Sequence, residues 1–364
     1  MKMNKKHKKK AVKEKQKERK KPTPLRIALT VLCGLLALIL LALLGGRLYF
    51  RLPVADYYRA SEKGFRIPGL SDGFVPQGLD YDDRTDLFWV TGYMDDDSAS
   101  PIYLVRRETG ALEKTVYLAC EDGSVYSGHA GGIAVGWDYA YVAGGSDRCI
   151  YAYSCDEIMT AEDGATVAAK GNLSTKVSED DSLRVSAVAI DDDYVYAVEF
   201  YRDLTNPTPE SHKITTPAGD VHHALAVAYK ISYEENAVFG LEPTPALAIS
   251  LPDQVQGLCR GEERMYLSTS YGMAFSYVYG YDLAYVNSEE NIYLLGTNVP
   301  LYHLDSSSLA EVRKLPPMAE EIVMVEGKLY TMCESASHKY LFGNLSSAQW
   351  CYATDLGPMK NRKS

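Results

Sequence analysis

The stretch that decides the fold runs from Gln256 to Gly272 and reads QGLCRGEERMYLSTSYG. A small residue near its start precedes a short strand, a polar turn and a second strand of aromatic and aliphatic residues. Short strands of this composition, joined by a turn rich in Gly and charged residues, are typical of a β-hairpin. The stretch therefore predicts two antiparallel strands.

The same unit recurs in four other places, which indicates a repeat protein. The other copies are QGLDYDDRTDLFWVTGY from Gln77, GGIAVGWDYAYVAGG from Gly131, SAVAIDDDYVYAVEF from Ser186 and EEIVMVEGKLYTMCES from Glu320. Successive copies begin 54, 55, 70 and 64 residues apart, which leaves room for two further strands in each. We expect these to be outer hairpins, such as SPIYLVRRETG followed by ALEKTVYL, and NIYLLGTNVPLYHLDSSS followed by AEVRKLPPM.

Four antiparallel strands per unit are the pattern of a β-propeller, in which blades stack around an axis and bury one another's faces. The predicted fold class is therefore all-β: a five-bladed propeller, or a six-bladed one if a sixth unit lies within the long third or fourth unit. A β-sandwich or two separate domains are the alternatives. Ring closure needs a strand from each end of the domain, and GFRIPGL (64–70) and QWCYATDL (349–356) are the candidates.

A transmembrane helix is predicted over residues 27–46, IALTVLCGLLALILLALLGG, which carry no charge. Twenty helical residues span about 30 Å, the thickness of a bilayer's hydrocarbon core. A cleaved signal peptide is the alternative, but its apolar run is shorter and ends in a small-x-small site. We therefore expect an uncleaved signal-anchor in the cell membrane.

The charge distribution predicts the orientation of this helix. Of the 38 Lys and Arg residues, 13 lie in residues 1–26 with only two acidic residues. The remainder holds 25 basic and 46 acidic residues, a net charge of −21. The positive-inside rule then predicts a cytoplasmic N-terminus and an extracytoplasmic C-terminal domain. The predicted parts are a basic tail (1–26), the helix (27–46), a juxtamembrane stalk (47–66), the propeller (67–356) and a C-terminal tail (357–364).

The repeat resembles the bacterial propellers that include lactonase-like and quinoprotein-like proteins. The resemblance covers roughly Gly73 to Leu356 and rests on the unit seen in QGLCRGEERMYLSTS and GGIAVGWDYAYVAGG. It implies the propeller fold. Activities in that group include ester and lactone hydrolysis, sugar processing and pure binding, so the resemblance selects no function.

Propeller sites lie where the innermost strands begin, around the central channel. The repeat alignment and the adjacent turns give the candidate ligand-binding residues: Gln77, His129, Arg184, Ser186, Gln256, Glu320 and Glu321. These are hydrogen-bonding groups with few acids or bases among them. The alternative is that they satisfy strand ends and channel waters.

The sequence predicts no metal site or cofactor. A glycosidase needs two carboxylates on different blades, and only the fifth unit offers Glu at an aligned position. The Asp clusters at 82–83, 95–97, 180–181 and 191–193 lack the calcium-loop pattern, although a structural cation there stays open. Six cysteines lie outside the membrane segment, which allows 15 disulfide pairings.

The predicted function is a membrane-anchored, extracytoplasmic binding or interaction module of the cell envelope, and we lean away from an enzyme. Its expected partners are the membrane and an envelope glycan, peptide or protein. Nucleic acid is not expected, because no aromatic residue is interleaved with the basic tail. The alternatives are a metal-assisted hydrolase of a lactone, ester or glycoside at the central channel, and an assembly factor whose blade edges dock other proteins.

Overall fold

A computed structural model describes residues 23–288 and 290–357. The chain divides into two compact units, residues 1–48 and residues 49–364. The predicted basic tail lies almost entirely outside the described residues. So does most of the predicted C-terminal tail.

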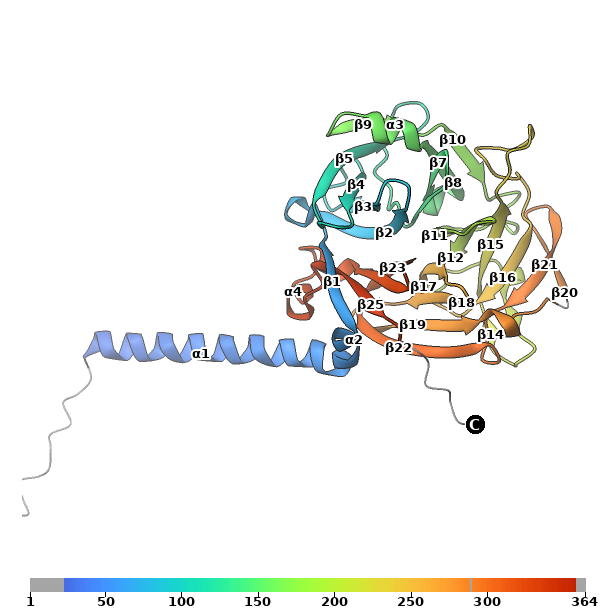
Figure 1. Ribbon diagram of the computed structural model, residues 1–364. Coiled ribbons are helices and arrows are strands. Elements are labelled where there is room, and N and C mark those ends of the chain that lie inside the picture. The colour runs from blue at the N-terminus through green and yellow to red at the C-terminus, as the bar shows by residue number, and fades with distance from the viewer. Residues whose placement is uncertain (1–22, 289, 358–364) are drawn as a thin grey trace, which may run out of the picture. The chain divides into compact units, whose positions relative to one another are not determined.

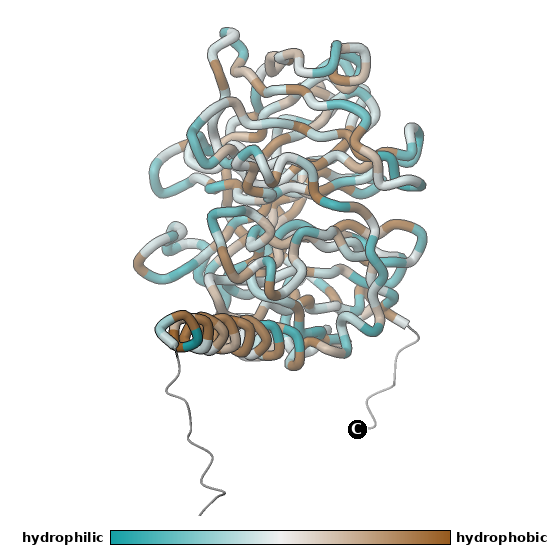
Figure 2. Tube along the Cα trace, turned by 90° about the vertical axis from the view of Figure 1, so that its left-hand side faces the viewer, coloured by the Kyte–Doolittle hydropathy of each residue, from teal (hydrophilic) through white to brown (hydrophobic). Residues whose placement is uncertain are grey.

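The described part of the first unit is a long helix, α1, whose bounds, Pro24–Arg51, extend three residues past the end of that unit. It contains the apolar run predicted at 27–46, and the leucines of that run are half or more exposed. Figure 2 shows it as brown, hydrophobic chain along most of its length. Among the described residues it is the one helix long and apolar enough to cross a membrane.

The second unit is a five-bladed β-propeller (Figure 1). Each blade is a sheet of four antiparallel strands, with additions in two of them. The first strands β2, β11, β17 and β23 lie toward the middle of the ring in Figure 1, and β5 and β22 lie at its edge. The five predicted repeat units supply the first and second strands of the five blades, so this prediction is confirmed.

The strand bounds follow the repeat. Blade 1 contains β2 (Phe74–Asp82), β3 (Leu87–Met94), β4 (Pro101–Arg106) and β5 (Leu112–Ala119). Blade 2 contains β6 (Ile133–Val135), β7 (Tyr139–Ala143), β8 (Cys149–Ser154) and β10 (Gly171–Ser174). Blade 3 contains β11 (Val185–Ile190), β12 (Tyr194–Glu199), β15 (Ala224–Lys230) and β16 (Leu247–Leu251). Blade 4 contains β17 (Val255–Arg260), β18 (Arg264–Thr269), β19 (Phe275–Asp282) and β22 (Leu309–Pro317). Blade 5 contains β23 (Ala319–Val325), β24 (Lys328–Cys333), β25 (Trp350–Asp355) and β1 (Ser61–Arg66).

Short helices and small strands fill the connections. The α-helices are α2 (Ala55–Ala60), α3 (Cys155–Thr160) and α4 (Gly343–Ser346), and the small strands are β9 (Ala165–Ala168), β13 (Ile214–Thr215), β14 (Val221–His222), β20 (Glu290–Leu294) and β21 (Thr297–His303). The 3-10 helices are η1 (Leu52–Val54), η2 (Leu70–Asp72), η3 (Gly145–Asp147), η4 (Glu210–His212), η5 (Leu283–Tyr285) and η6 (Glu334–Ala336).

The small residue near the start of the repeat lets neighbouring first strands approach closely around the axis. A Cβ added to Gly132 would lie 2.4 Å from the backbone nitrogen of Val188 in the next blade. A Cβ added to Gly78 would lie 2.8 Å from the backbone nitrogen of Ile133. Glycine is therefore needed at these positions because the backbones themselves are in contact.

The hydrophobic core lies between the blades. One cluster joins Trp89 of blade 1 to Tyr153 of blade 2, both fully buried. Others join blades 2 and 3, blades 3 and 4, and blade 5 with blades 4 and 1. All seven cysteines are free thiols, and five of them are buried.

The ring closes through β1, which pairs antiparallel with β25 as the outermost strand of blade 5. Both candidate segments for closure contribute to this pair. Residues 61–66, which the sequence analysis assigned to the stalk, therefore form a strand of the propeller. Phe65 of β1 is 1% exposed, and its ring centroid lies 5.0 Å from that of Phe88 in blade 1.

One predicted outer hairpin is correct and the other is wrong. The segments predicted after the first unit form β4 and β5. In the fourth unit, β20 and β21 pair with each other, and β21 joins β16 of blade 3 in parallel. The outer strand of blade 4 is β22, which pairs directly with β19. The long insertion thus extends the neighbouring blade, an outcome that strand composition alone does not encode.

Removing β1 is expected to prevent stable folding of the propeller. A chain that begins at residue 67 would leave the edge of β25 open and would lose the buried ring of Phe65. Substitution of a buried Phe by Ala alone costs about 3–5 kcal/mol. Size-exclusion chromatography and thermal unfolding should show aggregation, or no cooperative transition, for this chain. The chain that begins at Tyr49 should unfold cooperatively, and equal melting temperatures for the two chains would contradict the closure described here.

Candidate functional site

The channel mouth is the end of the ring at which the first strand of each blade begins. At this end a β-bulge interrupts the pairing of the first strand in four blades. The extra residue is Gln77 in β2, Ser186 in β11 and Gln256 in β17. In β23 the same irregularity contains Glu320 and Glu321. A bulge re-aims the extra side chain, so it explains why these positions differ from the ordinary alternation of a strand.

A cavity of about 360 Å³ opens at the channel mouth, and residues of all five blades line it. Five of the seven predicted binding residues belong to this lining: Gln77, His129, Arg184, Ser186 and Gln256. The size falls within the range of about 300–1,000 Å³ that is typical of small-molecule sites. The structure therefore brings together residues that lie up to 179 positions apart in the sequence.

The two predicted glutamates lie deeper than the cavity. Glu320 is 2% exposed, and its Oε1 accepts a long hydrogen bond of 3.4 Å from the side-chain amide of Gln256. Glu321 is 1% exposed and points into the ring. Its Oε2 accepts hydrogen bonds from the backbone N–H groups of Leu79, at 3.2 Å, and Ile133, at 2.9 Å. Glu321 thus ties blade 5 to the first strands of blades 1 and 2.

Sequence reasoning missed Glu334, which also lines the cavity. It follows directly after β24, the second strand of blade 5. Its Oε1 accepts hydrogen bonds from the hydroxyls of Tyr93, at 3.2 Å, and Tyr340, at 3.0 Å. Lys339 Nζ donates to the Tyr93 hydroxyl at 3.0 Å, and the ring of His129 lies 4.4 Å from that of Tyr93. The second strand of a hairpin returns to the end at which the first strand began. Residues that follow the second strands could therefore have been predicted to lie at the channel mouth.

Burial changes the protonation of the acids and the base near the mouth. Desolvation raises the pKa of Glu334, although bonds from two tyrosines and the charge of Lys339 act against it. Desolvation also raises the pKa of Glu320, with the charges of Glu334 and Glu321 adding to the shift. The pKa of His129 is lowered, first by desolvation and then by Lys339 and Arg184. The mouth therefore favours the neutral forms of Glu320, Glu334 and the His129 imidazole.

Arg184 is the charge that this arrangement leaves without a partner. Its side chain is exposed and lines the cavity. Its backbone N–H donates a long hydrogen bond of 3.4 Å to Glu199 Oε1. Within residues 23–288 and 290–357, its guanidinium has no ion-pair or hydrogen-bond partner. An unpaired guanidinium beside neutral amides and carboxyls makes the mouth suited to an anionic group.

The long loop at residues 202–220, between β12 and β15, contributes Asn206 to the lining of the cavity. A buried pair fixes this loop to the ring: His212 Nδ1 lies 2.7 Å from Glu199 Oε2, and both side chains are fully buried. Glu199 Oε2 also accepts a hydrogen bond from the backbone N–H of Leu225. The loop is therefore held in place by its own side chain at the wall of the site.

No observation favours the metal-assisted hydrolase over binding. In the part of the chain that the structure describes, no group of three or more His, Cys, Asp or Glu side chains could hold a metal ion. Several carboxylates of the Asp clusters accept hydrogen bonds from groups of their own turns. Asp191 Oδ1, for example, accepts from the backbone N–H groups of Asp193 and Tyr194. A structural cation stays an untested expectation.

The fold and the site define a five-bladed β-propeller with a polar cavity at the channel mouth. No family model matches the chain, and no curated protein matches its sequence. Among solved structures, it is similar to glutaminyl cyclase of Myxococcus xanthus, with 9% identity over 81% of this chain and 94% of that one, and a TM-score of 0.39. It is also similar to the PQQ-bound aldose sugar dehydrogenase of Streptomyces coelicolor, with 17% identity, coverage of 75% and 76%, and a TM-score of 0.39. A tail fibre of Staphylococcus aureus phage P68 has 9% identity, coverage of 82% and 53%, and a TM-score of 0.43. At these identities the similarity concerns the fold alone.

Proposed function

We propose that this chain is a membrane-anchored binding protein whose propeller takes a small carboxylate-bearing ligand at the channel mouth. The observation that carries the proposal is the cavity of about 360 Å³, which Arg184, without a partner among the described residues, lines together with Gln77 and Gln256 of two other blades. The ligand would be part of an envelope glycan, a peptide or another protein, as the sequence analysis expects.

The charges at the mouth favour a single negative charge on the ligand. Arg184 offers a planar pair of N–H donors that matches a carboxylate. Gln77 and Gln256 offer neutral amide groups for the rest of the ligand. Asp147 also lines the cavity and would repel a doubly charged phosphate more strongly than a carboxylate.

Arg184→Met is expected to weaken carboxylate binding about tenfold or more, because a hydrogen-bonded charge pair contributes about 1.5–3 kcal/mol. The probe is N-acetylalanine, with N-acetylalaninamide as its neutral counterpart, and calorimetry gives both affinities. The wild-type chain should prefer the acid, and the variant should lose that preference. Arg59→Met, which removes an exposed arginine of α2, serves as the matched control and should behave as wild type. An unchanged preference in Arg184→Met would refute the proposal.

The pH dependence of the same titration checks the role of Glu334. The pKa of Glu334 is raised by burial, so the carboxyl ionises only as the pH rises beyond its ordinary value of 4.5. Its negative charge then opposes a carboxylate ligand, and affinity should fall with rising pH. In Glu334→Gln the affinity should fall less with rising pH, and the remaining fall should reflect the loss of positive charge on His129.

Retention of α1 as an uncleaved anchor is expected to keep the full chain of 40.3 kDa in the membrane fraction after alkaline carbonate extraction. The length and apolar character of α1 support this proposal. Protease added to intact cells should digest the propeller if it lies outside, while an epitope at the N-terminus stays protected. A shortened, soluble chain would show instead that the segment is a cleaved signal peptide.

A further inference from the structure

A second cavity, of about 350 Å³, opens at the end of the propeller opposite the channel mouth. It lies where the first strands β2, β6 and β11 end, so blades 1, 2 and 3 enclose it. The turns after these strands and the adjoining strand ends supply most of its lining, and a loop of blade 3 adds Tyr233. The channel-mouth residues do not contribute to it, so it is a separate site.

Aromatic side chains give this cavity an unusual surface for a turn region. Trp137 occupies the tip of the β6–β7 turn and is 69% exposed, and Tyr233 is 77% exposed. Tyr81, Tyr139 and Tyr141 complete the aromatic lining. An indole that is 69% exposed at a two-strand turn buries little of its apolar area within its own fold, which is why it points to a ligand.

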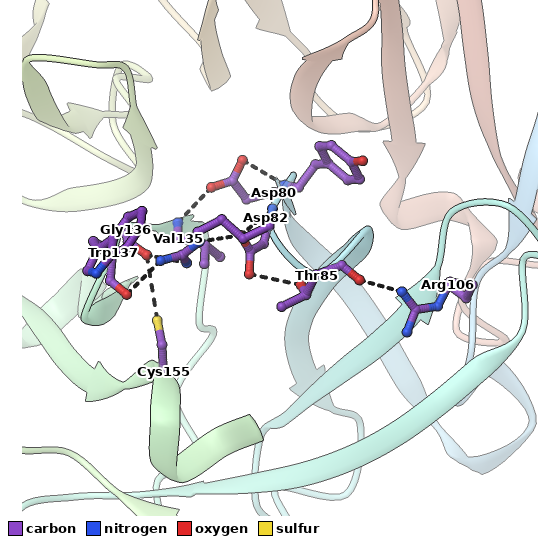
Figure 3. Close-up of polar contacts among 10 residues, drawn as sticks. Asp80, Asp82, Thr85, Arg106, Val135, Gly136, Trp137 and Cys155 are labelled. Carbon is purple, nitrogen blue, oxygen red and sulfur yellow. Dashed lines mark hydrogen bonds and ion pairs between the residues drawn. The ribbon is translucent and has the colours of Figure 1, made fainter. Parts of the chain in front are cut away.

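The Trp137 turn is held rigidly. Arg84 donates to the carbonyl oxygens of Gly136 and Trp137, each at 2.7 Å, and to Asp82 Oδ1 at 2.7 Å. Its guanidinium carbon lies 5.0 Å from the centroid of the Trp137 ring. Cys155 Sγ adds a longer contact of 3.8 Å to the Gly136 carbonyl, and Asp82 lies beside the turn (Figure 3). These contacts therefore fix the conformation of the turn in the absence of a ligand.

The charge of the lining is strongly negative. Five aspartates line the cavity, Asp82, Asp83, Asp138, Asp191 and Asp192, against one arginine. Arg84 is fully engaged by Asp82 and two carbonyls, and Asp191 pairs with Arg260 at 3.2 Å. Across the described residues, Asp83, Asp138 and Asp192 have no ion-pair partner. Aromatic faces ringed by free carboxylates complement a positively charged, weakly hydrated group.

From this combination we infer that the cavity binds an organic cation, such as a quaternary or alkylated ammonium group. The group lies against Trp137 and Tyr233, and the surrounding carboxylates supply the counter-charge. A carbohydrate would use the aromatic faces and could donate hydroxyls to the carboxylates, but it would leave their negative charge uncompensated. An anion would be repelled by it.

The test compares choline with 3,3-dimethylbutan-1-ol, its neutral counterpart of the same shape. The full chain is reconstituted in phosphatidylglycerol nanodiscs, which contain no choline, and titrated by calorimetry. We expect choline to bind and the neutral alcohol to bind at least about tenfold more weakly. Trp137→Ala should weaken choline binding about tenfold, whereas Tyr293→Ala, an exposed aromatic on β20 outside the cavity, should leave it unchanged.

The inference is overturned if no choline binds at about 10 mM, or if the alcohol binds as well as choline. Binding of N-acetylglucosamine in place of choline would likewise overturn it in favour of a sugar site. Trp137 is exposed at a turn, so its substitution should leave the thermal unfolding transition in place. That transition separates a loss of binding from a loss of fold.

Discussion

Glu321→Ala is expected to destabilise the propeller by about 4 kcal/mol, since each buried N–H left without an acceptor costs about 1–3 kcal/mol. The Glu321 carboxylate accepts from Leu79 in β2 and Ile133 in β6. One side chain thus connects the first strands of three of the five blades, β23, β2 and β6, around the axis.

Urea denaturation of the variants measures this effect. Glu321→Gln is the matched control, because the amide oxygen can still accept the backbone hydrogen bonds, and it should lose much less stability than Glu321→Ala. Burial raises the pKa of Glu321 well above 4.5. A wild-type-like denaturation midpoint for Glu321→Ala would show that the ring does not depend on this carboxyl.

Asp80→Asn is expected to gain stability over wild type as the pH rises from about 4 to about 7, by up to about 4 kcal/mol. Asp80 Oδ2 accepts from the backbone N–H of Val135 at 2.6 Å, and Oδ1 accepts from that of Tyr81 at 2.8 Å (Figure 3). Desolvation nevertheless outweighs these bonds and raises the pKa from 3.8 to about 7. Between these two values the unfolded chain has lost the proton and the folded chain keeps it.

The direction of the pH effect follows from that difference. The wild-type stabilisation by protonated Asp80 is complete below about pH 4 and is lost as the pH rises through about 7. Asparagine cannot ionise, and it keeps an oxygen for the Val135 N–H, so the variant avoids the loss. Urea titrations of both chains across this range measure the difference. Asp83→Asn, an exposed neighbour with the same change of charge, should show no such trend. A difference that stays constant with pH would contradict the assignment.

The fold was predictable because each repeat carries its own local signal. The small residue, short strand, polar turn and aromatic strand of Gln256–Gly272 reappear as β17 and β18, and the other units behave likewise. The glycines in these units mark places where backbones touch across blades, as Gly132 does. The strand within the predicted stalk was harder to predict from the sequence. SEKGFR forms a strand only by pairing with β25, which lies almost 290 residues away in the chain.

The site was predictable in part, for a physical reason. First-strand starts such as Gln77 and Gln256 share one position in the repeat, so the alignment finds them. The bulge in β23 is invisible to alignment, and it separates Glu320, near the mouth, from Glu321, which points into the ring. Glu334 was not among the predicted site residues, because it follows the second strand of its blade and the alignment was used only to find the starts of first strands. The partners of Arg84 at the opposite cavity come from a turn more than 50 residues away, and no sequence pattern records that contact.

The most direct measurement is a crystal structure of the propeller, beginning at Tyr49, soaked with N-acetylalanine. We expect electron density in the cavity at the channel mouth, with the carboxylate against the Arg184 guanidinium and the rest of the molecule beside Gln77 and Gln256. An empty mouth at saturating probe, or a probe bound elsewhere on the propeller, would contradict the proposed binding function.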